Sequence, residues 1–181
     1  MVATGIMKGL AVVFALVLGC AGATAQTPAP ALPGGASSLQ ETFEDWQVSC
    51  AVQGTVRLCR MAQQQRQKDG NQLVLAVELA PAAKDGVAGL LVLPFGLRLA
   101  DGVTLQIDEG KPSPALAFST CLPGGCLVPL GLDAGFVRAL RSGAALKIGA
   151  RANDGGQAVA LAVSLKGFAA AHDRLKVLAG S

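Results

Sequence analysis

The chain has 181 residues, of which 15 are Lys or Arg and 12 are Asp or Glu, giving a formal net charge of +3. This length suits one ordinary domain, and so small a charge argues against nucleic acid as a partner. Hydrophobic residues make up 51% of the chain but aromatic residues only 4%, so we expect a core built mainly from aliphatic side chains.

The first 25 residues have the three parts of a secretory signal peptide. Lys8 supplies the positive region, residues 10–18 form the apolar run, and Ala23-Thr24-Ala25 provides a small-residue cleavage site. The apolar run is too short to span a bilayer. The sequence therefore predicts an exported protein that is periplasmic, outer-membrane associated or secreted.

The sequence also offers an alternative processing site for the leader, at Cys20. Val17-Leu18-Gly19-Cys20 resembles the lipobox of bacterial lipoproteins, in which the cysteine carries the lipid and becomes the first residue. Lipidation at Cys20 excludes cleavage after Ala25. Membrane contact is expected only if Cys20 is lipidated.

Residues 26–39 consist largely of Pro, Ala, Gly and Ser, with hardly a side chain able to pack in a core. Such a composition is typical of a disordered linker. We therefore expect a folded domain over residues 40–178.

Cys50 and Cys59 are predicted to form a disulfide within a β-hairpin, because an exported domain permits disulfides. Two strand-like runs, 45–52 and 56–62, are joined at Gly54-Thr55, and Gly in the first position suits a type II′ turn. Counting outward from this turn makes the two cysteines a non-hydrogen-bonded pair, which brings their Cα atoms within disulfide reach. The same alternation places Trp46 on the buried face of the hairpin.

Cys121 and Cys126 are predicted to form a second local disulfide, across a turn centred on Pro123-Gly124. The alternatives are a redox pair or a zinc site. Neither cysteine pair has the spacing of a thioredoxin-like motif, and the single histidine, His172, lies far away in the sequence. We therefore expect structural disulfides, with no metal and no cofactor.

The rest of the domain alternates short apolar runs with Gly and Pro. Strand-like runs lie at 72–79, 90–93, 97–99, 103–107, 115–119, 127–130, 145–150 and 158–165. This spacing predicts a mainly β fold, a β-sandwich or barrel-like antiparallel domain. Two short helices are expected, one capped by Asp133 and ended by Gly143, and one over residues 169–178.

Five basic residues are candidates for binding. Arg57, Arg60, Arg66 and Lys68 form a modest basic strip along the first hairpin and the polar stretch that follows it, which we expect to be exposed. A solvated hairpin face explains the strip as well as a binding site does. Lys166 precedes Gly167, where a bend between a strand and a helix is a simpler explanation than a recognition element.

The chain offers little for catalysis. Asp108 and Glu109 stand at a predicted strand end, but neighbours on a strand point to opposite faces, which does not suit a pair of glycosidase carboxylates. His172 is expected on the surface of the last helix, without a serine or cysteine arranged beside it.

Several short motifs together resemble one protein family. These are DWQVSC at Asp45 to Cys50, IDEG at Ile107 to Gly110, the pair Cys121 and Cys126, and SLKGFAAA at Ser164 to Ala171. In order and spacing they are similar to the invasion-associated locus B family of alphaproteobacteria. The resemblance covers roughly residues 40–178. It implies an exported β-sandwich protein of the periplasm or outer membrane, linked in some pathogens to host-cell entry, without an established enzymatic activity.

The sequence thus favours a non-catalytic exported envelope protein that acts as a binding module, with a role in host-cell invasion or envelope maintenance. Its partner is an unidentified envelope or host protein or polymer. The alternative is a periplasmic enzyme that acts on glycans.

Overall fold

The computed structural model describes residues 31–69 and 72–180. In this part of the chain it contains ten strands, two α-helices and two short 3-10 helices. They are η1 (Pro33–Gly35), β1 (Ser38–Phe43), β2 (Trp46–Gln53), β3 (Val56–Arg66), β4 (Leu73–Pro81), β5 (Val87–Leu93), η2 (Leu99–Asp101), β6 (Thr104–Ile107), β7 (Thr120–Leu122), β8 (Gly125–Leu132), α1 (Ala134–Ser142), β9 (Ala145–Arg151), β10 (Ala158–Ser164) and α2 (Phe168–Ala179).

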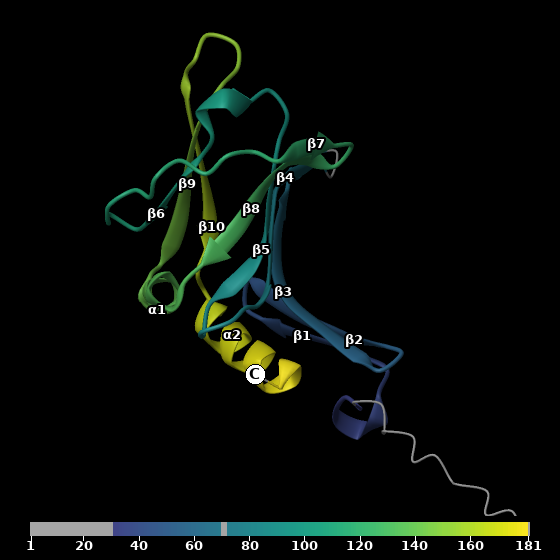
Figure 1. Ribbon diagram of the computed structural model, residues 1–181. Helices are drawn as coiled ribbons and strands as arrows, with labels where there is room; N and C mark the ends of the chain where they lie inside the picture. The colour runs from purple at the N-terminus through teal and green to yellow at the C-terminus, as the bar shows by residue number, and fades with distance from the viewer. Residues whose placement is uncertain (1–30, 70–71, 181) are drawn as a thin grey trace, which may run out of the picture.

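The strands form two antiparallel sheets. The large sheet has the order β1-β2-β3-β4-β5-β8-β7, and the small sheet has the order β10-β9-β6. Figure 1 shows the small sheet and α2 on the same side of the large sheet. Buried residues of both sheets and both helices form one core. The expectation of a mainly β fold is confirmed, in its sandwich form.

Alternation along the strands explains which residues fill this core. Trp46 and Val48 of β2 and Met61 of β3 point inward and are fully buried. The Trp46 ring meets Phe168 of α2 edge to face, with 5.1 Å between ring centroids, and its Nε1 donates to the carbonyl oxygen of Ser164. Trp46 is therefore a core residue, as expected, and it joins the large sheet to α2.

The helices begin and end at the predicted signals. The Asp133 side chain accepts a hydrogen bond from the Phe136 amide at the start of α1, and α1 ends before Gly143. Gly167 precedes α2 with φ of +79°, and a Cβ there would lie 2.0 Å from the carbonyl oxygen of Phe43. This close approach requires glycine, which confirms the predicted bend.

Both predicted disulfides are confirmed. Gln53 pairs with Val56 beside the turn, Gly54 has φ of +61°, and Cys50 faces Cys59 with 4.1 Å between their Cα atoms. Cys121 faces Cys126 at 3.9 Å. In each case the hairpin register brings the two cysteines together.

The linker prediction is wrong for residues 31–39. Leu32 is only 2% exposed and belongs to the core, and β1 pairs with β2 from Ser38 onward. A single leucine and one edge strand are enough to order a segment whose composition is otherwise typical of a linker. The predicted signal peptide, Cys20 and residues 26–30 lie outside the described residues.

The polar stretch after Met61 is not simply exposed, because β3 continues to Arg66. Gln63 is 6% exposed; its Nε2 donates to the Ser164 carbonyl oxygen, and its Oε1 accepts from the Ser164 amide. Gln65 Nε2 donates to the Ala162 carbonyl oxygen. These side-chain amides therefore act in place of a neighbouring strand along part of the open edge of β10.

Candidate functional site

The side of the large sheet that points away from the small sheet and α2 is here called the outer face. Alternation places every second residue of β3, β4, β5 and β8 on it, in cross-strand rows such as Ala62, Glu78, Leu90 and Pro129. The apolar positions of these four strands include Leu58, Ala62, Ala76, Ala80, Ala88, Leu90, Val92, Leu127, Pro129 and Gly131. β7 adds Leu122 at one end.

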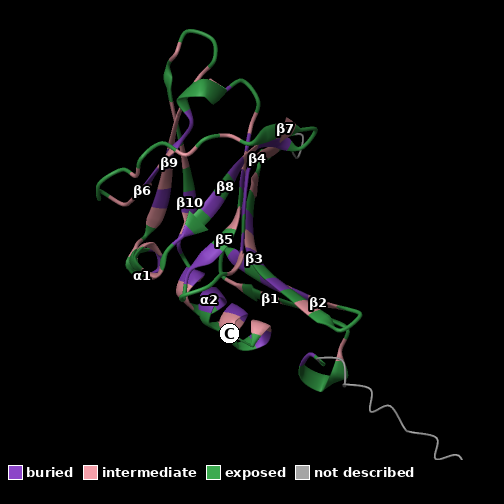
Figure 2. Ribbon diagram, in the orientation of Figure 1, coloured by how far each residue is buried: buried purple, intermediate pink, exposed green. Residues whose placement is uncertain are grey.

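Much of this apolar surface meets solvent. Leu90 is 40% exposed and Leu122 is 53% exposed. Figure 2 shows exposed and half-buried positions alternating with buried ones along the strands of the large sheet. Isolated exposed leucines are common, but a contiguous apolar face is typical of an interaction surface.

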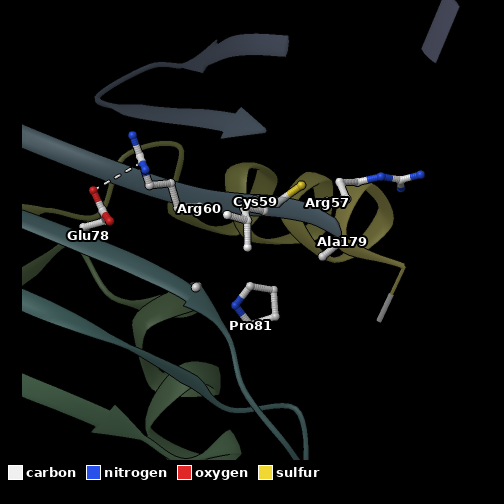
Figure 3. Close-up of a pocket in the computed structure, with 8 residues that line it drawn as sticks. Arg57, Cys59, Arg60, Glu78, Pro81 and Ala179 are labelled. Atoms are coloured by element: carbon white, nitrogen blue, oxygen red, sulfur yellow. Dashed lines mark ion pairs between the residues drawn. The ribbon is translucent and has the colours of Figure 1, made fainter. Parts of the chain in front are cut away.

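One ion pair lies on the outer face, between β3 and β4. Arg60 Nε is 3.3 Å from Glu78 Oε2, and both side chains remain more than half exposed. Figure 3 shows the pair reaching from β3 to β4. This part of the face thus carries one positive and one negative charge, so its net charge is zero.

Two hollows meet at Glu78. One, of about 420 Å³, is lined by Arg57, Leu58, Arg60, Glu78, Ala80 and Pro81 among others (Figure 3). The other, of about 320 Å³, is lined by Ala62, Ala76, Glu78, Val92, Leu122 and Leu127 among others. The first hollow is also lined by Cys59 and by Ala179 of α2, so it lies at the border of the outer face, whereas the second lies within the face.

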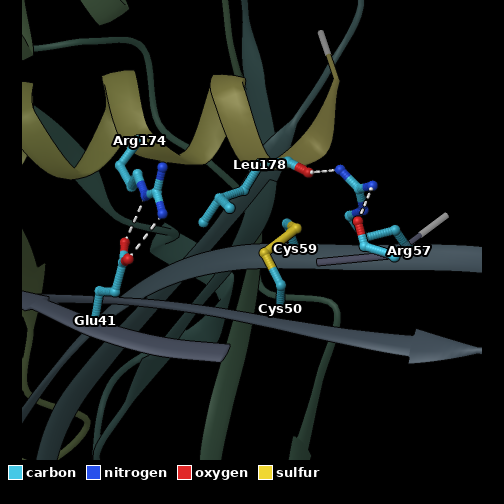
Figure 4. The surroundings of a disulfide bond; sticks show 7 residues. Glu41, Cys50, Arg57, Cys59, Arg174 and Leu178 are labelled. Carbon is cyan, nitrogen blue, oxygen red and sulfur yellow. Dashed lines mark hydrogen bonds and ion pairs between the residues drawn. A yellow bond between two sulfur atoms is a disulfide. The ribbon is translucent and has the colours of Figure 1, made fainter. Parts of the chain in front are cut away.

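The structure does not bring the five candidate basic residues together. Arg57 shares the inward side of β3 with Cys59, and its guanidinium donates to the carbonyl oxygens of Leu178, at 2.6 Å, and Ala31, at 2.9 Å (Figure 4). Arg60 lies on the opposite side, in the outer face. The predicted basic strip is therefore split by the two-residue period of the strand.

The other three basic candidates lie apart from one another. Arg66 ends β3 and donates to Gln64, and Lys68 is exposed in the turn that follows. Lys166 is exposed in the turn before α2, beside the close approach of Gly167 to Phe43. They do not form one basic site.

The two carboxylates considered for catalysis have separate contacts. Asp108 accepts hydrogen bonds from the main-chain amides of Ala144 and Ala145, which closes the turn before β9. Glu109 forms an ion pair with Lys147. Asp108 therefore holds the backbone, and Glu109 lies in a solvent-exposed pair.

His172 was expected on the surface, but it is only 5% exposed. It stacks on Phe168, and Arg141 Nη1, which also binds Asp173, lies 3.2 Å from its Nδ1. Burial first, and the positive charge of Arg141 second, lower the pKa of His172. Helical spacing could have revealed this, since positions 168, 171, 175 and 178 place the ring on the buried side of α2.

Residues 31–69 and 72–180 contain no group of three or more His, Cys, Asp or Glu side chains placed to hold a metal ion. Within the same residues, neither helix combines the length and the apolar character needed to cross a membrane.

Sequence reasoning missed the outer face, although one signal for it existed. β4 and β5 read LVLAVELAP and VAGLLVL, with apolar residues on both sides of the strand. An antiparallel strand with one solvated face usually alternates apolar and polar residues. The missing alternation could have indicated a second surface that is apolar.

Comparisons with known proteins agree with these observations. The family model described as invasion associated locus B protein matches residues 46–176. An invasion protein B homolog of Brucella abortus is 49% identical over 150 residues, covering 83% of this chain and 86% of that protein. Invasion protein B of Bartonella bacilliformis is 34% identical over 149 residues, covering 81% and 80%.

A solved structure is also similar. The crystal structure of invasion associated protein B from Bartonella henselae superposes with a TM-score of 0.72 at 36% identity, covering 77% of this chain and 96% of that one. The shared fold therefore extends over nearly all of that protein.

Proposed function

Because this chain belongs to the invasion-associated locus B family, we propose that it is a non-catalytic exported protein of the bacterial envelope that binds another protein through its outer face. The leader of the sequence supports export to the periplasm, the outer membrane or the exterior. The names of its relatives support a role in host-cell invasion, and envelope maintenance is the alternative role.

The observation that carries this proposal is the contiguous apolar outer face with its exposed leucines. Burying one exposed leucine contributes on the order of 1 kcal/mol, and the face offers Leu90 and Leu122 together with a floor of small side chains. The ion pair on this face adds no net charge, because Arg60 and Glu78 have opposite signs. The partner we propose is therefore a protein surface that is apolar and nearly neutral.

The contacts of Asp108 also support a non-catalytic role. A carboxylate held by two main-chain amides is placed to close a turn, and not to transfer a proton to a substrate. Among the described residues we find no observation that favours the glycan-acting enzyme.

The proposal is tested by placing a photo-crosslinking residue at position 90 of the full chain in its own bacterium. We expect an adduct whose linked peptide, read by mass spectrometry, comes from an apolar protein surface. Ala88→Arg, in the same face, should abolish it.

The matched control places the crosslinker at Val177, which is exposed on α2, away from the outer face. An adduct at position 90 no stronger than at position 177, or one that survives Ala88→Arg, would count against the outer face as the binding surface.

A further inference from the structure

We propose that the protein bound at the outer face is a second copy of this chain, related to the first by a two-fold axis. This inference rests on the proposed function, because it names the partner of the same surface.

The first argument is charge complementarity. A two-fold interface is isologous, so any contact from residue i to residue j is accompanied by the contact from j to i. Arg60 and Glu78 are the ion pair of the outer face, on neighbouring strands β3 and β4. Exchanging their positions sets each Arg60 opposite the partner's Glu78. A partner surface with no charge at this point would bury the pair without offering either charge a second counter-charge.

The second argument is the position of the axis. Glu78 faces Ala62 across the strands, and Arg60 is two residues before Ala62, so the charged residues are diagonal neighbours. They are separated by about 5 Å across the sheet and about 7 Å along it. A two-fold axis that exchanges them lies parallel to the sheets and perpendicular to the line between the two residues. Because that line is diagonal to the strands, the strands of the two copies cross at about 70°, near the orthogonal class of sheet packing.

The third argument concerns the residues beside this axis. Ala62 and Ala80 occupy the other diagonal of the same square of residues, and their small side chains let the two sheets approach closely. The same exchange brings Leu90 of one copy near Leu58 of the other. Leu58 is the exposed leucine of β3 next to the ion pair, at 52% exposure.

The size of the face fits a moderate affinity. β3, β4, β5, β8 and β7 span about 24 Å across, and each long strand contributes about 20 Å of length. Two such faces, crossed about an axis between β3 and β4, overlap only in part, so the buried area lies below that of standard specific interfaces. We therefore expect a dimer with a dissociation constant in the micromolar range, roughly 1–100 μM.

Sedimentation velocity on the exported full chain, with both disulfides formed, tests the proposal over roughly 1–500 μM. We expect a reversible monomer–dimer equilibrium. Arg60→Glu alone and Glu78→Arg alone should each weaken it at least about tenfold, because each places like charges opposite one another.

An equimolar mixture of these two variants should restore the dimer. The new acid at position 60 of one copy then faces the new base at position 78 of the other, and the unchanged Glu78 of the first copy faces the unchanged Arg60 of the second. Val177→Arg should leave the dimer unchanged, and thermal unfolding checks that every variant is folded. A wild-type chain that stays monomeric, or a mixture that stays monomeric, overturns the inference.

The two proposals fail separately. The wild-type chain could be monomeric while the crosslinker at position 90 captures a different protein and Ala88→Arg abolishes the adduct. In that case the dimer proposal is wrong and the outer face remains the binding surface. If neither a dimer nor such an adduct forms, both proposals are wrong.

Discussion

Arg57 joins two parts of the chain that are far apart in sequence. Its guanidinium binds the last turn of α2 through Leu178 and the segment just before η1 through Ala31. A cation at a helix C-terminus satisfies a carbonyl that lacks an intrahelical partner and also interacts favourably with the helix dipole. These contacts assign Arg57 a structural role.

Replacing Arg57 with Met should therefore lower the free energy of unfolding by about 1–2 kcal/mol, since two hydrogen bonds from a charged group are lost. Urea unfolding with the disulfides intact measures this. Lys68→Met, in the exposed turn after β3, serves as the control and should change stability by less than about 0.5 kcal/mol. Equal stabilities of the two variants would argue against a structural role for the Arg57 contacts.

His172 should make stability depend on pH. Its pKa is lowered in the fold by burial and by Arg141, whereas in the unfolded chain it is about 6.5. Below that value the unfolded chain binds a proton that the folded chain does not, so stability is full above about pH 6.5 and is lost as the pH falls through the folded pKa. Asp173 and Asp85 oppose this loss, and Lys176 adds to it.

His172→Gln should flatten the unfolding free energy between pH 7 and pH 5, as measured by urea titration at each pH. The pKa of Glu41, beside Arg174, and that of Asp173, beside Arg141, are also lowered. Their contributions are lost only below about pH 4, which separates them from the histidine. A wild-type protein equally stable at pH 7 and pH 5 would contradict this reading of His172.

At the scale of elements, two hairpins carry the disulfides, and both bridges close short loops. Cys50 and Cys59 are nine residues apart, and Cys121 and Cys126 are five apart. The first hairpin also contacts α2, whose Arg174 forms a bidentate ion pair with Glu41 of β1 (Figure 4). The first bridge therefore supports the sheet where α2 packs on it, and the second closes the hairpin formed by β7 and β8.

Replacing both cysteines of a bridge with Ala should cost roughly 2–3 kcal/mol, with the larger loss for Cys50 and Cys59 because their loop is longer. Chemical unfolding of the two double variants, compared with the oxidised wild type, measures the difference. A larger loss from the Cys121 and Cys126 pair would show that loop length does not decide the order.

At the scale of the whole molecule, the sequence predicted contacts between neighbouring segments better than contacts between distant ones. Turn chemistry and alternation placed Cys50 opposite Cys59 and buried Trp46, because neighbouring residues decide both. The pairing of β5 with β8 could not be predicted, since β6 and β7 lie between them in the chain and β6 joins the small sheet instead. Strand order depends on how the sheets pack.

The dependence on packing also explains why the outer face was not predicted from the sequence. The apolar runs of β4 and β5 were visible in the sequence, but not which of their two sides the small sheet and α2 would cover. Arg57 was within reach of sequence reasoning, because it shares the inward phase of β3 with Cys59 and Met61. Its partners were not, since Ala31 and Leu178 meet only in the folded protein.

The contacts of Arg57 also hold Ala31 and Leu178 close to each other. A single guanidinium reaches Ala31 and Leu178, so the first and last turns of the domain are spatial neighbours. A short Gly-Ser linker could therefore join residue 180 to residue 31. A circular permutant reopened at the exposed turn between β9 and β10 should keep both sheets and both disulfides, with its new ends in that turn.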